Sequence, residues 1–547
     1  MFRALLLVAL IAVCLGSPAK QAEPDWLRNT LVYQIYPRSF KDSNEDGIGD
    51  LNGITSKLEH IKDIGVDALW LSPIYTSPQV DFGYDIADFT NISAEYGTLA
   101  DFDKLVKKAK SLGLKVLLDF VPNHSSPDHE WFKKSVKKIK PYDEYYVWRN
   151  AKMINGTRHP PNNWLSVFQG SAWEWNAERG QYYLHQFAAG QPDLNYRSKA
   201  LDQEMKNAIS FWMDRGVEGF RIDAINFMFE DPRFLDEPKL DRPDLPPDDY
   251  DTLDHIYTKN LNETYDVLKS WRKLMDDHSN KIKGPKKMIL TEAYASFDLT
   301  LRYYEAGSNV PFNFMYIGDL TNQSSAADFK FYTDQWINNV PGGLYVPNWV
   351  VGNHDNHRAA SRFGKQRADM LSVMSMMLPG IAVLYNGDEI GMYHLKSRDP
   401  ERTPFQWDAT TSAGFSTSSK TWLPVHSNYK SLNLAAQKTA AASHYKVFKA
   451  LSALKKTRVI ESGNLQITLV TDKVLGIVRR HGPAAAVALI NFSNSPVIVD
   501  ARTWLNIPDK LTVHAASIGS NISAGFVANM THAYLPGAAS VVYIGNM

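Results

Sequence analysis

The feature that most constrains this chain is the alternation of short apolar, β-branched runs with amphipathic helical patterns. Strands that alternate with helices predict a parallel sheet, because each crossover helix packs back onto the sheet. Eight such strands with helices between them predict an α/β fold of the (β/α)8 TIM-barrel type. The expected strands are 31–36, 67–71, 115–121, 219–223, 288–292, 312–316, 348–351 and 381–385, and helices are expected at 54–64, 101–112, 199–215, 253–276, 326–337 and 367–377.

Two segments depart from this alternation and divide the chain. Residues 122–195 are rich in Trp, Tyr, Pro, Asn and Gly and interrupt the pattern after the third strand, so we expect an inserted subdomain there. Residues 458–547 alternate short β-runs with turns, which predicts a C-terminal antiparallel β-domain. The barrel is therefore expected in two parts, 25–121 and 196–457.

Residues 1–17 are typical of a secretory signal peptide. Arg3 precedes an apolar run that is too short to span a bilayer, and small residues follow it. We therefore expect a secreted, extracellular protein, for example in a gut lumen, with no membrane span. Some of seven Asn-x-Ser/Thr sequons are expected to carry N-glycans, namely Asn91, Asn155, Asn262, Asn322, Asn491, Asn521 and Asn529.

The charge balance argues against one class of function. Lys and Arg total 59, and so do Asp and Glu, which leaves no basic excess to hold a nucleic-acid backbone. The chain also has 14 Trp and 26 Tyr, whose flat rings suit the faces of sugars, although a well-filled core is the commoner reason for such a content.

Chemically useful residues follow the carboxyl ends of four expected strands. His124 follows the third strand, Arg221 and Asp223 end the fourth, Glu292 ends the fifth, and Asn353–Asp355 follow the seventh. In a (β/α)8 barrel these ends form one mouth, where active sites lie. Each Asp alone is more simply a cap or a surface charge, but their joint placement favours a site. Two carboxyl groups there could act as nucleophile and proton donor on a glycosidic bond.

Four motifs resemble the signature regions of the α-amylase superfamily, glycoside hydrolase family 13. A fifth, Gln191–Asn195, resembles the extra region of the oligo-1,6-glucosidase-type α-glucosidases, and residues 36–43 and 80–85 are most similar to secreted insect maltases. The likeness covers nearly the whole chain after the signal peptide. The four motifs are Phe120–His124, Gly219–Asp223, Glu292 and Asn353–Asp355.

This resemblance implies roles for individual residues. Asp223 would be the nucleophile, Glu292 the general acid/base, and Asp355 the carboxylate that holds ring hydroxyls of the reacting sugar. Arg402 would help to close the pocket on the non-reducing end, although Arg398, one helical turn away, could serve instead. The residues implied to line this subsite are Asp81, Tyr84, His124, Phe168, Arg221, His354 and Arg402.

The electrostatic expectations follow from elementary rules. Arg221 and Asp223 are two residues apart on a strand and share a face, so the fixed charge of Arg221 should lower the pKa of Asp223 and keep it ionised. Glu292 would lie beside other carboxylates in a partly dry pocket, and both effects should raise its pKa, as an acid catalyst requires.

The loop after the first strand is a candidate metal site. It matches the first nine positions of a calcium-binding loop, but position twelve is Gly53 and not Glu, so it is not a complete EF-hand. A polar turn without metal is the alternative. The family often holds structural Ca²⁺ or Mg²⁺ there, and no organic cofactor is expected. The oxygen ligands would be Asp42, Asn44, Asp46, the carbonyl of Ile48, and Asp50.

These expectations define a secreted retaining α-glucosidase. It would remove terminal α-1,4-linked glucose from maltose, malto-oligosaccharides and sucrose through a covalent glucosyl-enzyme intermediate. The alternatives are a sucrose-preferring hydrolase of the same family and a non-catalytic receptor or transporter partner; such partners commonly lack the catalytic carboxylates, which this chain keeps. Ala224 follows the nucleophile, where the family pattern places Val in enzymes that favour α-1,6 links, so a preference for α-1,4 links is expected.

Overall fold

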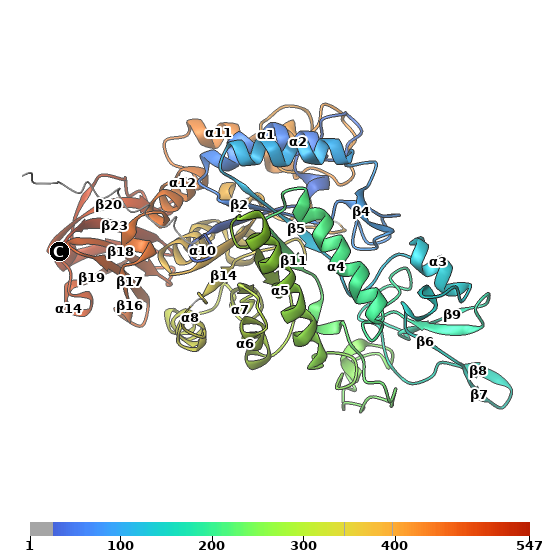
Figure 1. The fold of residues 1–547 in the computed structure, drawn as a ribbon. Helices are drawn as coiled ribbons and strands as arrows, with labels where there is room; N and C mark the ends of the chain where they lie inside the picture. The colour runs from blue at the N-terminus through green and yellow to red at the C-terminus, as the bar shows by residue number, and fades with distance from the viewer. Residues whose placement is uncertain (1–25, 344, 397) are drawn as a thin grey trace, which may run out of the picture.

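A computed structural model describes residues 26–343, 345–396 and 398–547 (Figure 1). The predicted signal peptide, 1–17, lies outside these residues. Within them, eight strands form one sheet in which neighbouring strands pair in parallel, in the order β13-β12-β11-β5-β2-β1-β15-β14. The predicted barrel is therefore confirmed. Its strands are β1 (Leu31–Ile35), β2 (Ala68–Leu71), β5 (Lys115–Phe120), β11 (Gly219–Ile222), β12 (Met288–Thr291), β13 (Val310–Pro311), β14 (Asn348–Val350) and β15 (Ile381–Tyr385).

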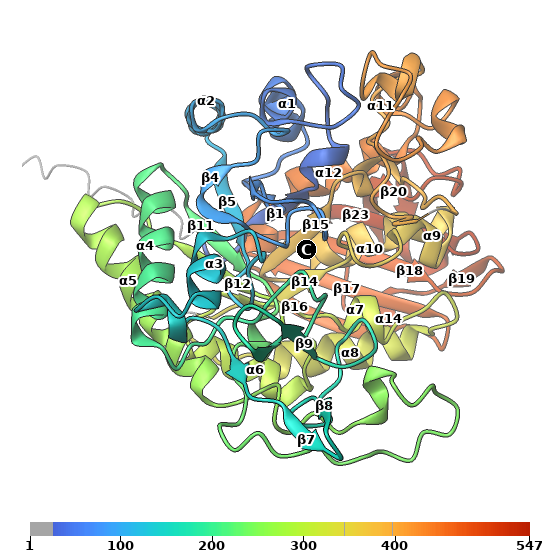
Figure 2. The ribbon, with the colours of Figure 1, turned by 90° about the vertical axis from the view of Figure 1, so that its right-hand side faces the viewer.

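Helices surround this sheet, as Figure 2 shows. Local sequence sets where they begin: Asp50 accepts the Gly53 amide at 2.7 Å before α1, and Thr98 forms a capping box with Asp101 before α2. The main covering helices are α1 (Leu51–Asp63), α2 (Leu99–Ser111), α4 (Lys199–Asp214), α5 (Glu263–Ile282), α6 (Phe297–Glu305), α8 (Ala326–Asn339), α10 (Lys365–Met377) and α12 (His444–Lys455).

The strand register explains why the site residues meet. On β11, Arg221 is level with Asp119 of β5 and with Leu290 of β12. Residues at the carboxyl ends of these three neighbours therefore lie at one height. The barrel interior below them is apolar and fully buried, with Val32, Trp70, Leu117, Leu290 and Val383 among its side chains.

Two predicted elements are wrong in their extent. The sixth strand was expected at 312–316, but β13 ends at Pro311, and Met315–Gly318 form the short helix α7. Asn313 Oδ1 accepts the Met315 amide at 3.2 Å, which favours a turn over an extended strand. The helix expected at 253–276 starts only at Glu263. Residues 253–262 instead form an irregular wall segment, because the buried carboxylate of Glu237 holds their polar groups, as described below.

Two smaller β-structures lie at opposite ends of the molecule in Figure 1. The segment after β5 contains α3 (Glu130–Val136) and an antiparallel sheet of β6 (Trp148–Arg149), β10 (Gln181–Leu184) and β9 (Trp173–Asn176). The C-terminal antiparallel sheet has the order β16-β17-β18-β23-β20-β21, as expected. Its strands are β16 (Asn464–Leu469), β17 (Val474–His481), β18 (Ala484–Asn491), β20 (Lys510–Ala516), β21 (Val527–Asn529) and β23 (Ser540–Asn546).

Two expectations concern a membrane span and the sites of N-glycans. Among the described residues, no helix is both long enough and apolar enough to cross a membrane. Six of the seven predicted glycan acceptors are exposed, but Asn491 is buried and its Nδ2 donates to the carbonyls of Ser495 and Pro536 at 2.9 Å. A glycan on Nδ2 would replace one of its two N–H donors and break at least one of these bonds, so we no longer expect a glycan at Asn491.

Candidate active site

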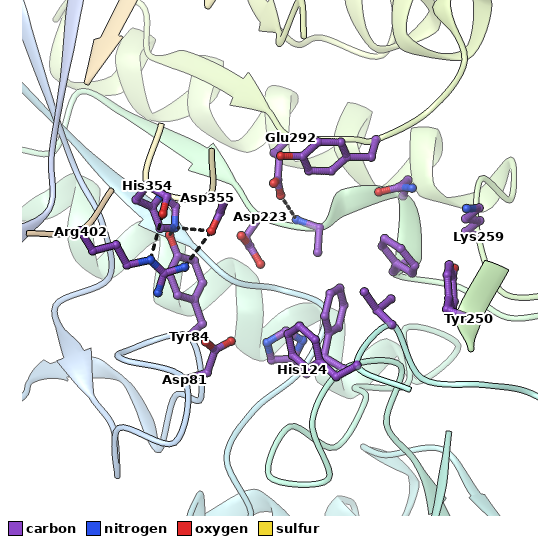
Figure 3. A pocket seen from close by; sticks show the side chains of 17 residues that line it. Asp81, Tyr84, His124, Asp223, Tyr250, Lys259, Glu292, His354, Asp355 and Arg402 are labelled. Carbon is purple, nitrogen blue, oxygen red and sulfur yellow. Dashed lines mark hydrogen bonds and ion pairs between the residues drawn. The ribbon is translucent and has the colours of Figure 1, made fainter. Parts of the chain in front are cut away.

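A cavity of about 420 Å³ opens at the carboxyl ends of the barrel strands (Figure 3). All but one of the catalytic and substrate-binding residues that the resemblance implied line this cavity. The exception is Arg221, which is buried and binds the carboxylates of Asp223 and Glu292. The structure therefore brings all of these residues together. Those that line the cavity are Asp81, Tyr84, His124, Phe168, Asp223, Glu292, His354, Asp355 and Arg402.

One guanidinium holds the two central carboxylates. Arg221 Nη1 contacts Asp223 Oδ1, and its Nη2 lies 3.1 Å from Glu292 Oε1. Asp119, buried at the end of β5, accepts from Nη1 at 2.9 Å and fixes the guanidinium from below. Because one planar group contacts both carboxylates, Asp223 and Glu292 face the same part of the cavity, as two carboxyl groups that act on one glycosidic bond must.

The residue after Asp223 orients Glu292. Ala224 has φ +43° and ψ +34°, the left-handed conformation that a non-glycine residue rarely adopts. In this turn its amide donates to Glu292 Oε2 at 2.9 Å. The small side chain of Ala224 also lines the cavity. The local strain thus supplies a hydrogen bond at the reacting centre.

Burial dominates the ionisation of the central pair. It raises the pKa of Asp223 to about 7, although the charge of Arg221 opposes that rise. The expectation of a lowered pKa for Asp223 was therefore wrong: Arg221 acts in the expected direction, but desolvation is larger. Burial, opposed by Arg221 and assisted by Asp223 and Asp355, raises the pKa of Glu292 to about 7, as expected. Near neutral pH the pair can hold one proton, which leaves one anion and one acid.

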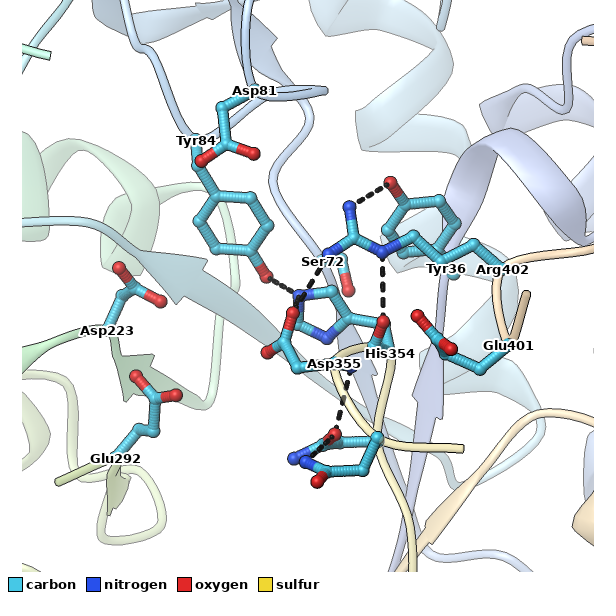
Figure 4. Close-up of polar contacts among 12 residues, drawn as sticks. Tyr36, Ser72, Asp81, Tyr84, Asp223, Glu292, His354, Asp355, Glu401 and Arg402 are labelled. Carbon is cyan, nitrogen blue, oxygen red and sulfur yellow. Dashed lines mark hydrogen bonds and ion pairs between the residues drawn. The ribbon is translucent and has the colours of Figure 1, made fainter. Parts of the chain in front are cut away.

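A connected network forms one end of the cavity (Figure 4). Arg402 donates from Nη2 to Asp355 Oδ1 and from Nε to the His354 carbonyl, both at 2.9 Å. The Tyr84 ring stacks on His354 at 5.3 Å, and its hydroxyl lies 2.7 Å from His354 Nε2. Burial raises the pKa of Asp355, but His354, Arg402 and Arg221 outweigh it and hold the pKa below its usual value.

The structure decides between the two arginines. Arg402 is part of the cavity lining, whereas Arg398 is not; its Nε donates to Asp399 at 2.9 Å and its side chain is 69% exposed. Arg402 is therefore the arginine placed at the pocket.

Gln191, within the motif singled out from sequence, joins two further residues. Its Nε2 lies 2.9 Å from Asp81 Oδ2 and 3.1 Å from His124 Nε2. Burial lowers the pKa of His124 to about 3 and raises that of Asp81 to about 6. His124 is therefore neutral at pH 7 and can hydrogen-bond a sugar hydroxyl without carrying a charge.

Sequence reasoning missed the other end of the cavity. The sequence offers a signal for three of the residues that line this end. Asn226, Phe227 and Tyr294 lie two to four residues beyond a predicted catalytic carboxylate. Val167, Phe187 and Tyr250 come from segments without periodicity, and Lys259 comes from a segment that was expected to be helical. The missed lining residues are Val167, Phe187, Asn226, Phe227, Tyr250, Lys259 and Tyr294.

A buried carboxylate fixes this missed wall. Glu237 Oε2 lies 2.6 Å from His255 Nδ1, and its Oε1 accepts the Thr258 hydroxyl at 2.9 Å. The Tyr250 ring stacks on His255 with centroids 3.6 Å apart. These contacts hold residues 253–258 out of the helix and place Tyr250 and Lys259 opposite Arg402, across the two central carboxylates (Figure 3).

The predicted metal loop is closed by its own side chains. Asp42 Oδ2 accepts the Gly47 amide at 2.8 Å, and Asp50 caps α1. In the part of the chain that is described, no group of three or more His, Cys, Asp or Glu side chains could hold a metal ion. The donors are all hard oxygens, the type that Ca²⁺ and Mg²⁺ prefer, so a cation there stays a prediction. The predicted ligands were Asp42, Asn44, Asp46, Ile48 and Asp50.

Comparison with known proteins agrees with this geometry. The alpha-amylase catalytic-domain model matches residues 34–463. The chain belongs to the α-amylase family. Maltase 1 of Drosophila virilis is 47% identical over 526 residues, covering 91% of this chain and 83% of that protein.

Two further relatives extend the likeness of this α-amylase family member. An alpha-glucosidase of Apis mellifera is 45% identical over 546 residues and covers 95% of each chain. The crystal structure of the alpha-glucosyl transfer enzyme XgtA has a TM-score of 0.83 at 33% identity, covering 95% of this chain and 99% of that one. The resemblance to insect maltases that the motifs indicated is confirmed.

Proposed function

We propose that this chain is a retaining α-glucosidase that releases terminal glucose from maltose and short malto-oligosaccharides, and from sucrose. The observation that carries the proposal is the pair Asp223 and Glu292, bridged by Arg221 and facing the Asp355–Arg402 ion pair across one cavity. The full-length likeness to a maltase and an alpha-glucosidase supports it.

The geometry performs the reaction in two steps. Asp355, Arg402 and His354 bind the hydroxyls of the non-reducing glucose, which selects a chain end. Ionised Asp223 attacks C1 while protonated Glu292 gives its proton to the glycosidic oxygen, so the C1–O bond breaks as the glucosyl–Asp223 ester forms. Glu292, now anionic, takes a proton from water, the water oxygen attacks C1, and Asp223 leaves as a carboxylate. Two inversions release α-glucose.

Arg221 and Tyr84 support the charges that form during these two steps. Arg221 keeps its charge at all working pH, because Asp119, Glu292 and Asp223 raise its pKa and outweigh its burial. It therefore stabilises the anion of Asp223 whenever the ester breaks. The Tyr84 ring, held by His354 and Asp119, offers an apolar face to the positive charge of an oxocarbenium-like transition state.

The test is turnover of p-nitrophenyl α-glucoside, with NMR of the first anomer released from maltose. Asp223→Asn should reduce kcat by ~10⁴-fold or more with an unchanged circular dichroism spectrum. Asp472→Asn, an exposed aspartate in the turn before β17, is the matched control and should be unchanged. A nucleophile variant that keeps a tenth of the activity, or β-glucose as first product, would contradict the mechanism. Comparing kcat/KM on maltose and sucrose separates a maltase from a sucrose-preferring enzyme.

We further propose that the enzyme is secreted and glycosylated and holds a structural cation. The N-terminal residue pattern and the exposed sequons support the first two points. Hard oxygen donors in the loop from Asp42 to Asp50 support the third; Ca²⁺ or Mg²⁺ there would brace the start of α1 and take no part in the reaction.

A further inference from the structure

A second cavity of about 550 Å³ adjoins the catalytic one. It lies among the segments that follow β12 and β13, beside α6 and α7. Lys259 and Tyr294 line both cavities, so the two adjoin at these side chains. Its volume falls within the ~300–1,000 Å³ typical of small-molecule sites.

The wall of this second cavity is aromatic and partly exposed. The Tyr294 ring stacks on Phe314 with centroids 4.7 Å apart and planes 19° apart, yet Tyr294 remains 51% exposed. Phe312 packs behind Phe314 at 5.5 Å. A rigid, exposed ring presents the apolar face on which the C–H face of a pyranose packs.

Polar donors lie beside these rings. Among the described residues, none forms a hydrogen bond or ion pair with the ammonium of Lys259, which lies 5.3 Å from the Tyr250 ring centroid. Its three N–H groups are therefore available to a ligand. Asn356 Nδ2 lies 3.4 Å from the Tyr294 hydroxyl and lines the same cavity. Rings with amide and ammonium donors match a neutral, hydroxyl-rich ligand.

The direction of the catalytic cavity points to the occupant. Arg402 and Asp355 lie at one end, and Lys259 lies at the other, beyond Asp223 and Glu292 (Figure 3). If the non-reducing glucose binds at Arg402, the rest of the chain must leave past Glu292 toward Lys259. The second cavity continues that path.

We propose that the second cavity binds the third and fourth glucosyl units of malto-oligosaccharides, and so gives the enzyme a preference for substrates longer than maltose. This inference rests on the proposed α-glucosidase function. Maltose, which ends before this cavity, gains nothing from it.

The experiment compares kcat/KM on maltose, maltotriose and maltotetraose. Phe314→Ala removes the ring that supports Tyr294 and should lower kcat/KM on maltotetraose about three- to tenfold, with maltose changed less than twofold. Gly318→Leu should act in the same direction by filling the cavity, since a Cβ at Gly318 meets no atom within 4 Å. Phe331→Ala, which removes a 61% exposed ring on α8, is the matched control.

The outcomes separate the two proposals. A wild type that cleaves maltose, with a maltotetraose-to-maltose ratio unchanged in both Phe314→Ala and Gly318→Leu, overturns the second site alone. A wild type that cleaves neither sugar overturns the proposed function. If Phe314→Ala does not fold, Gly318→Leu decides the question by the same ratio.

Discussion

The contact between Arg402 and Asp355 offers a sharp test of how the pocket recognises a chain end. Arg402→Gln keeps a polar side chain but removes the charge and the bond to Asp355 Oδ1 at 2.9 Å. Hydrogen bonds to charged groups contribute about 1.5–3 kcal/mol, which corresponds to about 10- to 160-fold in kcat/KM. Asp355 is 35% exposed, so solvent screening places the expected loss in the lower half of that range.

The same substitution should change the pH dependence. Asp355 must be ionised to accept sugar hydroxyls, and Arg402 is one of the charges that hold its pKa below the usual value. Without Arg402 that pKa rises, so the anion is protonated sooner as the pH falls. Asp223, with a pKa of about 7, sets the first acidic loss of activity in both enzymes. At lower pH, protonation of Asp355 should add a further loss, so kcat/KM should fall more steeply with decreasing pH in Arg402→Gln than in wild type.

Arg398→Gln is the matched control, because Arg398 is an exposed arginine of the same segment and is not part of the cavity lining. The assay is steady-state kinetics on maltose and p-nitrophenyl α-glucoside between pH 4 and pH 9. Equal losses in the two variants would refute the reasoning. So would an Arg402→Gln enzyme that stays within twofold of wild type and falls no more steeply at low pH.

Three further predictions concern separate parts of the molecule. Because burial and neighbouring carboxylates raise the pKa of Glu292 to about 7, and the acid must be protonated, kcat/KM should fall as the pH rises through about 7; a profile flat to pH 9 would contradict this. Chelation should lower the melting temperature if the loop Asp42–Asp50 holds a cation, whereas unchanged melting of a metal-free preparation would show an empty loop. Wild type should prefer maltose to isomaltose, and Ala224→Val should move the kcat/KM ratio toward isomaltose by about tenfold or more, at some cost in stability because a β-branched residue is strained at φ +43°. An unchanged ratio would remove Ala224 from the specificity argument.

The barrel and its catalytic residues could be predicted from sequence because both depend on local patterns. Apolar runs and helical periodicity are properties of neighbouring residues, and the eight strands follow from them. Once the strands are assigned, the parallel register places Asp223 and Glu292 at one edge, so the core of the site follows without coordinates.

Other features depend on distant contacts and could not be predicted in this way. The segment with Lys259 matched a helical pattern, but the buried Glu237 holds residues 253–258 as an irregular wall. The sixth strand was misplaced for a different reason: β13 is only Val310–Pro311, too short to carry a periodic signal, and the polar turn at Asn313 follows it.

The sequence by itself determined the order of strands and helices, the carboxylates at the strand ends and the family to which the chain belongs. Only the tertiary structure decided that Arg402, and not Arg398, lines the pocket, and that burial outweighs Arg221 in setting the pKa of Asp223. The physical reason is that desolvation and cavity shape are sums over side chains brought together from the whole chain, whereas strand and helix patterns are set by residues a few positions apart.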